Sequence, residues 1–172
     1  IKGGVYLEEA RKLRAIALDK TGTITEGKPR LVATEVLSPS DPEAKVLSWA
    51  ASLAGHSDHP VSKAIAKGLN LPENGLTDFT ALPGRGIEAR LDGHNLILGN
   101  HRLIEDRGLC SPEIEARLAV HENQGRTATL LATEDRVLAI FAVADTIKES
   151  SREAITDLHR LGVTSVMLTG DN

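Results

Sequence analysis

The sequence predicts an α/β domain that is interrupted by an inserted α+β domain. Two short apolar runs, at residues 14–18 and 164–168, have the composition of buried parallel strands, and each is followed at once by small polar residues. Between them lies a block of helix-like and hairpin-like segments. We therefore expect residues 1–29 and 145–172 to belong to one parallel-sheet domain and residues 30–144 to form the insert.

Bulk composition argues against several classes of function. The chain has 172 residues, a net charge of −4 and no basic stripe, which gives no reason to expect a nucleic-acid partner. Its lone cysteine, Cys110, excludes an internal disulfide and any cysteine-based metal cluster. No apolar run approaches the roughly 20 residues that span a bilayer. Because the sequence starts without Met and stops at Asp171-Asn172, inside an expected loop, we expect it to be part of a longer protein.

The outer segments are expected to contain two helices besides the two strands. A short helix is expected at residues 5–13, before the first strand, and Glu26-Gly27-Lys28-Pro29 is rich in turn formers and should begin a linker. An amphipathic helix is expected from Thr146 to Leu161, closed by Gly162. Its expected inward side chains are Ile147, Ser151, Ala154, Ile155, Leu158 and Leu161.

The insert is expected to begin with a strand at residues 31–37 and a pair of helices. Ser40-Asp41-Pro42 and Asp58-His59-Pro60 each combine a capping side chain with a first-turn proline, and the first helix should end near Gly55. Strands should follow at residues 79–82, 87–91, 95–98, 127–133 and 136–144, with hairpin turns at Asp92-Gly93 and Glu134-Asp135 and a helix from Ser111-Pro112 to near Gly125.

Asp19 is the first candidate for chemistry. It follows the first apolar run directly, and ligands bind at the carboxyl ends of strands in open α/β sheets. The next residues, 20–25, include small hydroxyl side chains and a glycine that can turn tightly and offer donors to an anion. A carboxylate in this position can attack a phosphoryl group and become an aspartyl phosphate. The alternative is that Asp19 only caps a loop.

This stretch resembles the phosphorylation signature of the P-type ATPases. Residues 19–25 match the pattern D-K-T-G-T-[LI]-T at every position. The resemblance implies a haloacid-dehalogenase-like, Rossmann-like phosphorylation domain with Asp19 as the nucleophile and Lys20, Thr21 and Thr23 as further catalytic residues. It also implies Mg²⁺ held by the Asp19 carboxylate and the Thr21 carbonyl. Related phosphatases resemble one another in carrying a second Asp two residues after the nucleophile, where this chain has Thr21.

Thr169-Gly170-Asp171 follows the second apolar run as Asp19 follows the first. If the two strands are adjacent and parallel, both loops meet at one crevice, where Thr169 and the N–H of Gly170 can hold the transferring phosphoryl group. The triplet resembles the T-G-D of P-type ATPases, which implies that Asp171 belongs to the same catalytic group. The alternative is an ordinary strand-to-helix turn.

Four further stretches resemble elements of the heavy-metal class of P-type ATPases, class IB, and imply a site for ATP. Ser57-Asp58-His59-Pro60 is similar to an S-x-H-P motif whose histidine packs on adenine. Gly84-Arg85-Gly86 is similar to a G-x-G element and Gly99-Asn100 to a G-N element. Asp145-Thr146-Ile147-Lys148 is similar to the family's D-P-x-[KR] element, with Thr146 where many members have proline, and this implies that Asp145 orders a hinge near the nucleotide and magnesium. As an alternative, Asp145 is the N-cap of the next helix.

The chain departs from the family at one position of the expected nucleotide site. The family commonly has a glutamate five residues before the motif histidine, where it accepts from the adenine amino group, and this chain has Ala54 there. Either Asp58 or a water takes this role, or adenine selectivity is weaker. His56 and His59 have the spacing of a metal pair, but no further ligands lie near them in the sequence. Lys2-Gly3-Gly4 through Glu8 also looks similar to the family's K-G-G-x-x-[LI]-E stretch.

Taken together, the resemblance implies the cytoplasmic ATP-binding domain and part of the phosphorylation domain of an ATPase in a bacterial plasma or inner membrane. The implied cargo is a heavy-metal cation, with Zn²⁺, Cd²⁺ or Pb²⁺ favoured and copper as the alternative. ATP and Mg²⁺ are the implied cofactors, and the transmembrane and actuator domains of a full-length chain are the implied partners. This chain alone is expected to bind ATP without turnover. Two other classes stay open: a soluble phosphatase of the same superfamily, and a nucleotide-binding regulatory module.

Overall fold

The computed structural model describes Glu9 and residues 11–168, and these divide into two compact units. One unit is Pro29–Ala144, and the other combines the described residues up to Lys28 with those from Asp145 onward. The sequence-based boundaries, after Pro29 and after Ala144, lie close to these. The expected helix at residues 5–13 and the Lys2-Gly3-Gly4 stretch lie largely outside the described residues.

The Pro29–Ala144 unit is built on a six-stranded sheet with the strand order β2-β7-β6-β5-β4-β3. Its strands are β2 (Thr25–Val36), β3 (Thr77–Leu82), β4 (Gly86–Leu91), β5 (His94–Asn100), β6 (Thr127–Ala132) and β7 (Val137–Ile147). The pairs β3–β4, β4–β5, β5–β6 and β6–β7 are antiparallel. The β4–β5 hairpin turns at Asp92-Gly93, where both residues have positive φ. The expected α+β insert is confirmed.

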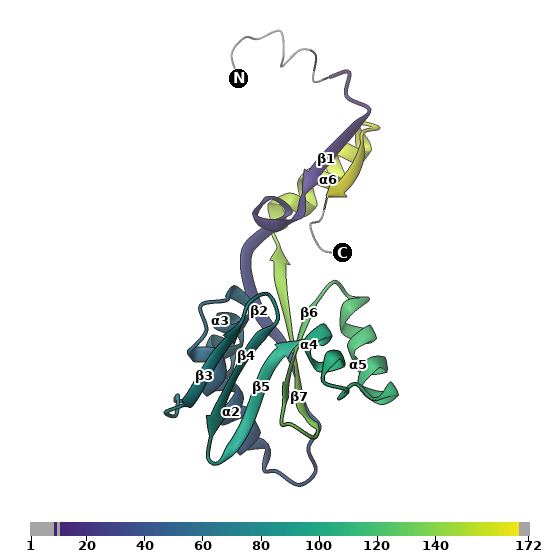
Figure 1. The fold of residues 1–172 in the computed structure, drawn as a ribbon. Coiled ribbons are helices and arrows are strands. Elements are labelled where there is room, and N and C mark those ends of the chain that lie inside the picture. The colour runs from purple at the N-terminus through teal and green to yellow at the C-terminus, as the bar shows by residue number, and fades with distance from the viewer. Residues whose placement is uncertain (1–8, 10, 169–172) are drawn as a thin grey trace. The chain divides into compact units, whose positions relative to one another are not determined.

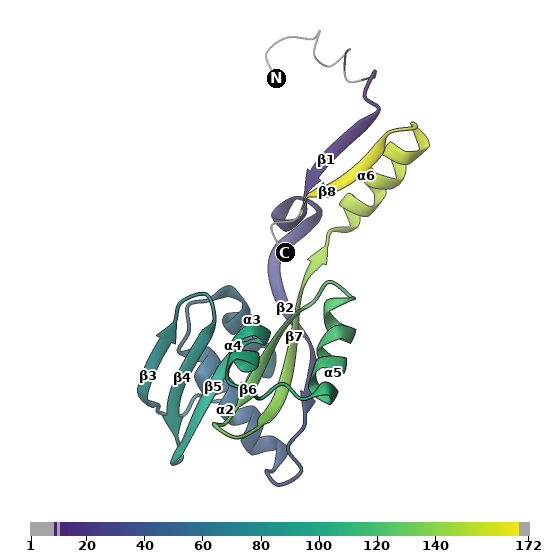
Figure 2. The same cartoon turned by 45° about the vertical axis from the view of Figure 1, so that its right-hand side comes forward.

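Helices cover both faces of this sheet, as Figures 1 and 2 show. They are α2 (Glu43–Gly55), α3 (Pro60–Leu69), α4 (His101–Asp106) and α5 (Pro112–Glu122). Trp49 of α2 and Ile65 of α3 belong to one buried cluster, and Leu118 of α5 belongs to a second. Because each face has its own cluster, the neighbours Leu130 and Leu131 point into different cores. Covering on both faces also explains why five of the six residues of β6 are buried.

Two details of the insert differ from the expectations. Pro42 stands before α2 rather than in its first turn, and no side chain caps the helix. The expected cap, Asp41, instead accepts hydrogen bonds from Ser38 Oγ at 2.7 Å and Arg136 Nη2 at 3.0 Å. The six-residue α4 was not expected, because a helix this short shows no periodic apolar pattern.

The second unit contains a two-stranded parallel sheet of β1 (Ala15–Asp19) and β8 (Thr164–Leu168). The expected parallel pairing is therefore confirmed. The loop η1 (Lys20–Ile24) follows β1, and α6 (Glu149–Arg160) packs against β8 and η1. α6 begins later than expected because β7 continues to Ile147.

The expectation that this unit's strands and helix are buried is wrong for the described residues. α6 has no buried residue, and Leu161, expected on its inward face, is 78% exposed. In β8, Val166, Met167 and Leu168 are each at least half exposed. A two-stranded sheet and one helix provide too little surface to cover one another's apolar faces.

The expectation that a linker begins at residues 26–29 is also wrong, because β2 runs without a break from Thr25 to Val36. β2 stands at the edge of the strand order, where Pro29 can be accommodated although it has no N–H to donate. Gly27, with φ +69°, provides backbone angles that favour glycine. The chain thus passes from one unit to the other within β2 and returns within β7. Among the described helices, none combines the length and apolar character needed to cross a membrane.

Candidate functional site

Asp19 is the last residue of β1, and the chain enters a tight loop directly after it. Its register partner is Leu168, the last residue of β8, so the carboxyl ends of the two strands lie together. Thr169-Gly170-Asp171 follow Leu168 in the chain but lie outside the described residues. The Asp19 side chain is exposed at the edge of a parallel sheet where ligands bind in α/β proteins.

The loop after Asp19 is closed from inside by Thr25. Although η1 carries a helix label, Thr21 has ψ 121° and Gly22 has φ 75°, so the backbone here is a turn and not a helix. The Thr25 hydroxyl accepts from the Gly22 N–H at 3.2 Å and lies 3.0 Å from the Lys20 carbonyl oxygen. The last threonine of the D-K-T-G-T-I-T stretch therefore shapes the loop that carries Lys20, Thr21 and Thr23.

Asp145 holds the same loop from the other end of the chain. One of its carboxylate oxygens lies 2.5 Å from Thr25 Oγ1 and accepts from the Gly27 N–H at 3.1 Å, and the other accepts from the Lys28 N–H at 3.0 Å. The alternative that Asp145 caps the following helix is wrong, because Lys148 occupies the N-cap position of α6. Asp145 instead ties the start of β2 to the end of β7.

Lys148 and Ser151 bind the carbonyl groups of the loop. Lys148 Nζ donates to the Gly22 oxygen at 2.6 Å and to the Thr23 oxygen at 3.2 Å, and Ser151 Oγ donates to the Thr23 oxygen at 3.3 Å. The loop after Asp19 is thus fixed by contacts within its own unit, which is the preorganisation that an electrostatically driven reaction needs. The sequence reasoning gave Lys148 and Ser151 no such role.

A cavity of about 430 Å³ lies in the Pro29–Ala144 unit, within the size range of small-molecule sites. It is formed by the segment before and at the start of α3, the β3–β4 turn and the face of β6. The cavity brings together four of the expected nucleotide-binding residues, which are His59, Gly84, Gly86 and Asn100. Thr127 and Thr129 also line it and were not expected. Their spacing of two places both on one face of a strand, which is the signal that could have found them.

His59 is the N-cap residue of α3, and a backbone N–H of this helix holds its side chain. Its Nδ1 accepts a hydrogen bond from the Val61 N–H at 3.3 Å, and Pro60 occupies the first turn. A neutral imidazole whose Nδ1 is the acceptor carries its proton on Nε2, so the ring can stack on a ligand and donate from Nε2. The neighbouring Asp58 carboxylate lies 2.8 Å from Lys63 Nζ, and this ion pair lowers the pKa of Asp58.

The β3–β4 turn is fitted closely to the strand beside it. A Cβ on Gly86 would lie 2.3 Å from the Leu98 carbonyl oxygen, so only glycine allows this approach of two backbones. Asn100 fixes the turn from the other side: its Nδ2 donates to the Gly84 oxygen at 3.1 Å, while its Oδ1 caps α4 by accepting from the Leu103 N–H at 3.0 Å. Asn100 thus shapes the cavity wall through Gly84.

Three of the residues considered for the nucleotide site do not line the cavity. Gly99 packs under α4, where an added Cβ would lie 2.5 Å from Leu103 Cδ2. Asp145 belongs to the loop of Asp19. Ala54, which stands where the family commonly has a glutamate for the adenine amino group, is fully buried in the core and does not face the cavity. Asp58, one of the candidates to replace that glutamate, does line the cavity.

Comparison with known proteins places this chain in a family. A family model described as haloacid dehalogenase-like hydrolase matches residues 13–172. The chain therefore belongs to the haloacid dehalogenase-like hydrolases, which confirms the expected fold class.

Proteins similar to this chain include metal-transporting ATPases. The chain is 39% identical to a probable cadmium-transporting ATPase of Staphylococcus aureus (strain MRSA252), over 100% of its own length and 25% of that protein's. It is 40% identical to a copper-exporting P-type ATPase of Staphylococcus saprophyticus, over 99% of its own length and 21% of that protein's. A crystal structure of a zinc-transporting PIB-type ATPase matches it with a TM-score of 0.80 and 34% identity, over 100% of this chain and 28% of that one. The expected resemblance to heavy-metal P-type ATPases is confirmed, and the chain spans about a quarter of these relatives.

Proposed function

We propose that this chain is the ATP-binding and phosphate-accepting portion of a heavy-metal P-type ATPase. The observation that carries the proposal is the setting of Asp19, a carboxylate at the end of β1 whose loop is held by Thr25, Asp145 and Lys148. A nucleotide-binding regulatory module would not need this loop. A soluble phosphatase would place an acid–base carboxylate at the position of Thr21.

In the proposed reaction, a carboxylate oxygen of Asp19 attacks the γ-phosphorus of ATP. The bond between that phosphorus and the bridging oxygen to the β-phosphate breaks, ADP leaves with the bond's electron pair, and an aspartyl phosphate forms. Without an adjacent general base at Thr21, this intermediate persists long enough to be coupled to another event. The preorganised loop contributes by keeping its carbonyl oxygens bound to Lys148 and Ser151 and away from the incoming phosphate.

The residues at this edge suit Mg²⁺, which prefers hard oxygen ligands. The Asp19 carboxylate and the Thr21 carbonyl would hold the ion, and bound there it would neutralise negative charge on the phosphoryl group. Thr169, Gly170 and Asp171 are proposed to complete the phosphate and metal contacts, since they follow Leu168, the register partner of Asp19, in the sequence.

ATP is proposed to bind in the cavity of the Pro29–Ala144 unit. The His59 ring supplies a stacking surface and an Nε2 donor for the adenine, and Gly84 and Gly86 let the turn backbone approach the ligand. Thr127 and Thr129 add hydroxyl groups to the lining of the cavity. In this proposal Asn100 acts mainly by fixing the Gly84 turn, and Asp145 by fixing the Asp19 loop.

The cargo is proposed to be a heavy-metal cation moved across a bacterial plasma or inner membrane by transmembrane and actuator domains of a full-length chain. Identities of 39% to a cadmium-transporting and 40% to a copper-exporting ATPase are too close to choose between these cargoes. We favour Zn²⁺, Cd²⁺ or Pb²⁺, with copper as the alternative, because of the Ser57-Asp58-His59-Pro60 stretch and the zinc-transporting structural relative. Residues outside this chain would select the ion.

Calorimetric titration with ATP tests the proposal. We expect a Kd on the order of 0.1–1 mM, or about −4 to −5.5 kcal/mol, since an open cavity lacks closure contacts. His59→Ala should weaken binding by ~5–30-fold through loss of the stack and one hydrogen bond. His159→Ala, on α6 in the other unit, is the matched control and should bind like the wild type.

The same samples should release negligible phosphate from ATP. Electrostatic positioning supplies nearly all the catalysis of phosphoryl transfer. In this proposal, some of the charged residues that position Mg²⁺ and the phosphoryl group belong to parts of the full-length pump outside this chain. Equal ATP affinities of the wild type and His59→Ala would remove His59 from the site. Brisk hydrolysis by this chain would contradict the assignment as one portion of a pump.

A further inference from the structure

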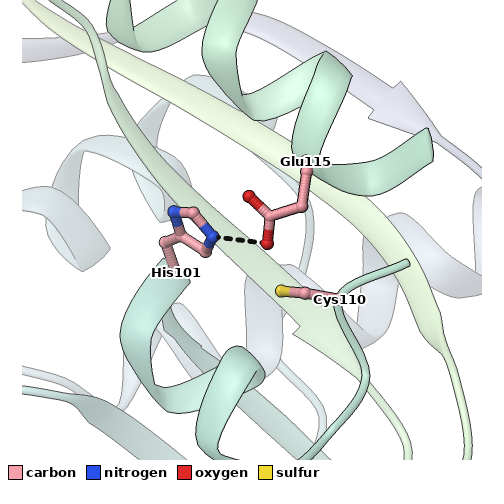
Figure 3. Close-up of side chains that lie close together, drawn as sticks. All are labelled: His101, Cys110 and Glu115. Carbon is pink, nitrogen blue, oxygen red and sulfur yellow. Dashed lines mark hydrogen bonds and ion pairs between the residues drawn. The ribbon is translucent and has the colours of Figure 1, made fainter. Parts of the chain in front are cut away.

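Three unlike metal-binding side chains converge on the face of the Pro29–Ala144 unit that is covered by α4 and α5. His101 is the first residue of α4, Cys110 lies in the connection between the helices, and Glu115 is in the first turns of α5. One ligand atom from each lies within 4.8 Å of the others (Figure 3). We propose that His101, Cys110 and Glu115 form a binding site for a Zn²⁺-like divalent cation, distinct from the ATP cavity and from the Asp19 edge.

The scaffold under these side chains is well packed. Leu103 and Ile104 of α4 and Leu118 of α5 are almost fully buried in one core cluster, and Cys110 packs against the same cluster. The start of α5 is fixed as well, because Ser111 Oγ accepts from the Ile114 N–H at 3.3 Å. A site on packed helices holds its ligands more precisely than one on a free loop, so little ordering cost would oppose binding.

A fourth residue orients the histidine. His101 Nδ1 lies 3.2 Å from Glu122 Oε1, while its Nε2 lies 2.9 Å from Glu115 Oε1. A metal-binding histidine usually donates its second ring N–H to a carboxylate, which fixes the tautomer and aims the other nitrogen at the ion. Glu122 is in the position of that carboxylate, and it leaves Nε2 directed toward Glu115 and Cys110, as Figure 3 shows.

The donor set selects the class of ion. Imidazole nitrogen, thiolate sulfur and carboxylate oxygen together suit a borderline cation such as Zn²⁺, whereas Mg²⁺ would reject the sulfur. A tetrahedral Zn²⁺ needs ligand atoms roughly 3.3–3.6 Å apart. Separations of 2.9 Å between His101 Nε2 and Glu115 Oε1 and of at most 4.8 Å within the group require only small side-chain movements. His101 and Glu115 are partly exposed, which leaves a fourth position for water.

Protons compete with the ion and determine the conditions of a test. Burial lowers the pKa of His101, but Glu115 and Glu122 raise it more, so the net shift is upward. Burial, with Glu115 and Glu105 nearby, raises the pKa of Cys110 to about 11. Binding therefore has to displace protons, and the titration is best done at about pH 8, where that competition is weaker.

Co²⁺ titration of the whole chain gives the sharpest test, because Co²⁺ replaces Zn²⁺ and shows a thiolate charge-transfer absorption. The chain has one cysteine, so such a band can only come from Cys110. We expect a band that saturates at one Co²⁺ per chain and disappears when Zn²⁺ is added. Cys110→Ser should abolish the band, and His101→Gln and Glu115→Gln should weaken binding by about 10–100-fold, as loss of a ligand or its support does elsewhere.

Glu122→Gln tests whether Glu122 orients the His101 ring without binding the ion itself. It should keep the band and weaken binding by roughly 10-fold, the lower end for outer partners of metal ligands. Glu113→Gln is the matched control, because this residue is on the same helix, is 77% exposed and pairs with Arg117. It should leave the titration unchanged.

Two results would overturn the proposal. One is the absence of a thiolate band at millimolar Co²⁺, and the other is a band that persists unweakened in both His101→Gln and Glu115→Gln. A measurement on the unchanged chain guards against variants that fail to fold: Zn²⁺ should slow alkylation of Cys110 by iodoacetamide. Alkylation at the same rate with and without Zn²⁺ would also contradict the site.

Discussion

The two units of the chain organise their functional residues by different physical means. In the Pro29–Ala144 unit the cavity rests on two buried clusters, and side chains such as Trp49, Phe141 and Leu138 are at most 1% exposed. Among the described residues of the other unit, Ile24 and Val163 are the only buried hydrophobic side chains. There the loop of Asp19 is instead held by hydrogen bonds that charged and hydroxyl side chains donate or accept.

Because of this difference, we expect one unit to determine the free energy of unfolding and the other to determine the reactivity of Asp19. A packed apolar core fixes a cavity with little dependence on any single polar group, whereas a loop held by a few hydrogen bonds depends on each of them. Substitutions in the Pro29–Ala144 unit should therefore change the free energy of unfolding most. Substitutions in the unit that carries Asp19 should change reactivity or local opening while leaving global stability nearly intact.

The largest expected effect is on chemistry, at Asp19. In a full-length pump, Asp19→Asn should reduce phosphoenzyme formation by ~10⁴-fold or more, as removal of a covalent nucleophile does elsewhere. ATP binding should be retained, because the amide has the same shape and removes a charge that repels the γ-phosphate. Acid-stable, hydroxylamine-labile phosphate incorporation measures the first effect. Asp157→Asn, exposed on α6, is the control, and incorporation by Asp19→Asn at the wild-type rate would refute the assignment.

The next effect compares two leucine truncations. Leu138→Ala removes a fully buried side chain from β7 and should cost about 2–5 kcal/mol of unfolding free energy. Leu168→Ala removes a side chain that is 54% exposed in β8 and should cost less than about 1 kcal/mol. Denaturant unfolding measures both costs: Trp49, the single tryptophan, reports on the Pro29–Ala144 unit, and far-ultraviolet circular dichroism reports on the secondary structure of both units. Equal costs would mean that the two units are equally well packed.

A smaller, local effect is expected at Asp145. Its carboxylate accepts from the N–H groups of Gly27 and Lys28, so Asp145→Asn replaces one acceptor oxygen by a donor that cannot bind either group. Hydrogen bonds to a charged group are worth about 1.5–3 kcal/mol, and amide exchange at these two positions should accelerate by ~10–100-fold. The Trp49 unfolding midpoint should barely change. Unaltered exchange at both amides would show that the loop does not depend on Asp145.

The smallest effect concerns pH and the Pro29–Ala144 unit. Burial raises the pKa of Glu35, but hydrogen bonds from Arg117 and His121, at 3.0 Å and 2.9 Å, outweigh it and hold the pKa below its usual value. A depressed pKa contributes stability above the unfolded-state pKa, and that contribution is lost as pH falls through the folded-state value. Glu35→Gln should therefore cost about 1 kcal/mol at pH 7 and progressively less toward pH 3. A cost that stays constant with pH, or that equals that of exposed Glu153→Gln, would contradict this.

Local signals in the sequence determined much of this protein. The apolar run before Asp19, the Asp92-Gly93 turn and the prolines that start α3 and α5 each act over a few residues, so they predict elements without knowledge of the rest of the fold. The motif around Asp19 is equally local, because its loop is built from consecutive residues, and it was the basis for the expected family. A shared parallel sheet for the two outer strands was also expected, since both apolar runs are followed at once by small polar residues.

Only the tertiary structure decided which distant residues support those elements. Asp145 reaches Thr25 across 120 positions of the chain, and Pro29 fits within β2 because that strand stands at the edge of the sheet order. Ala54 faces the core instead of the cavity. Cys110 lies close to His101 and Glu115. Both placements result from the register and packing of whole helices and strands. Periodicity within a segment identifies a face of that segment but not the surface that covers it. Contacts between segments depend on the packed chain as a whole, which no short stretch of sequence encodes.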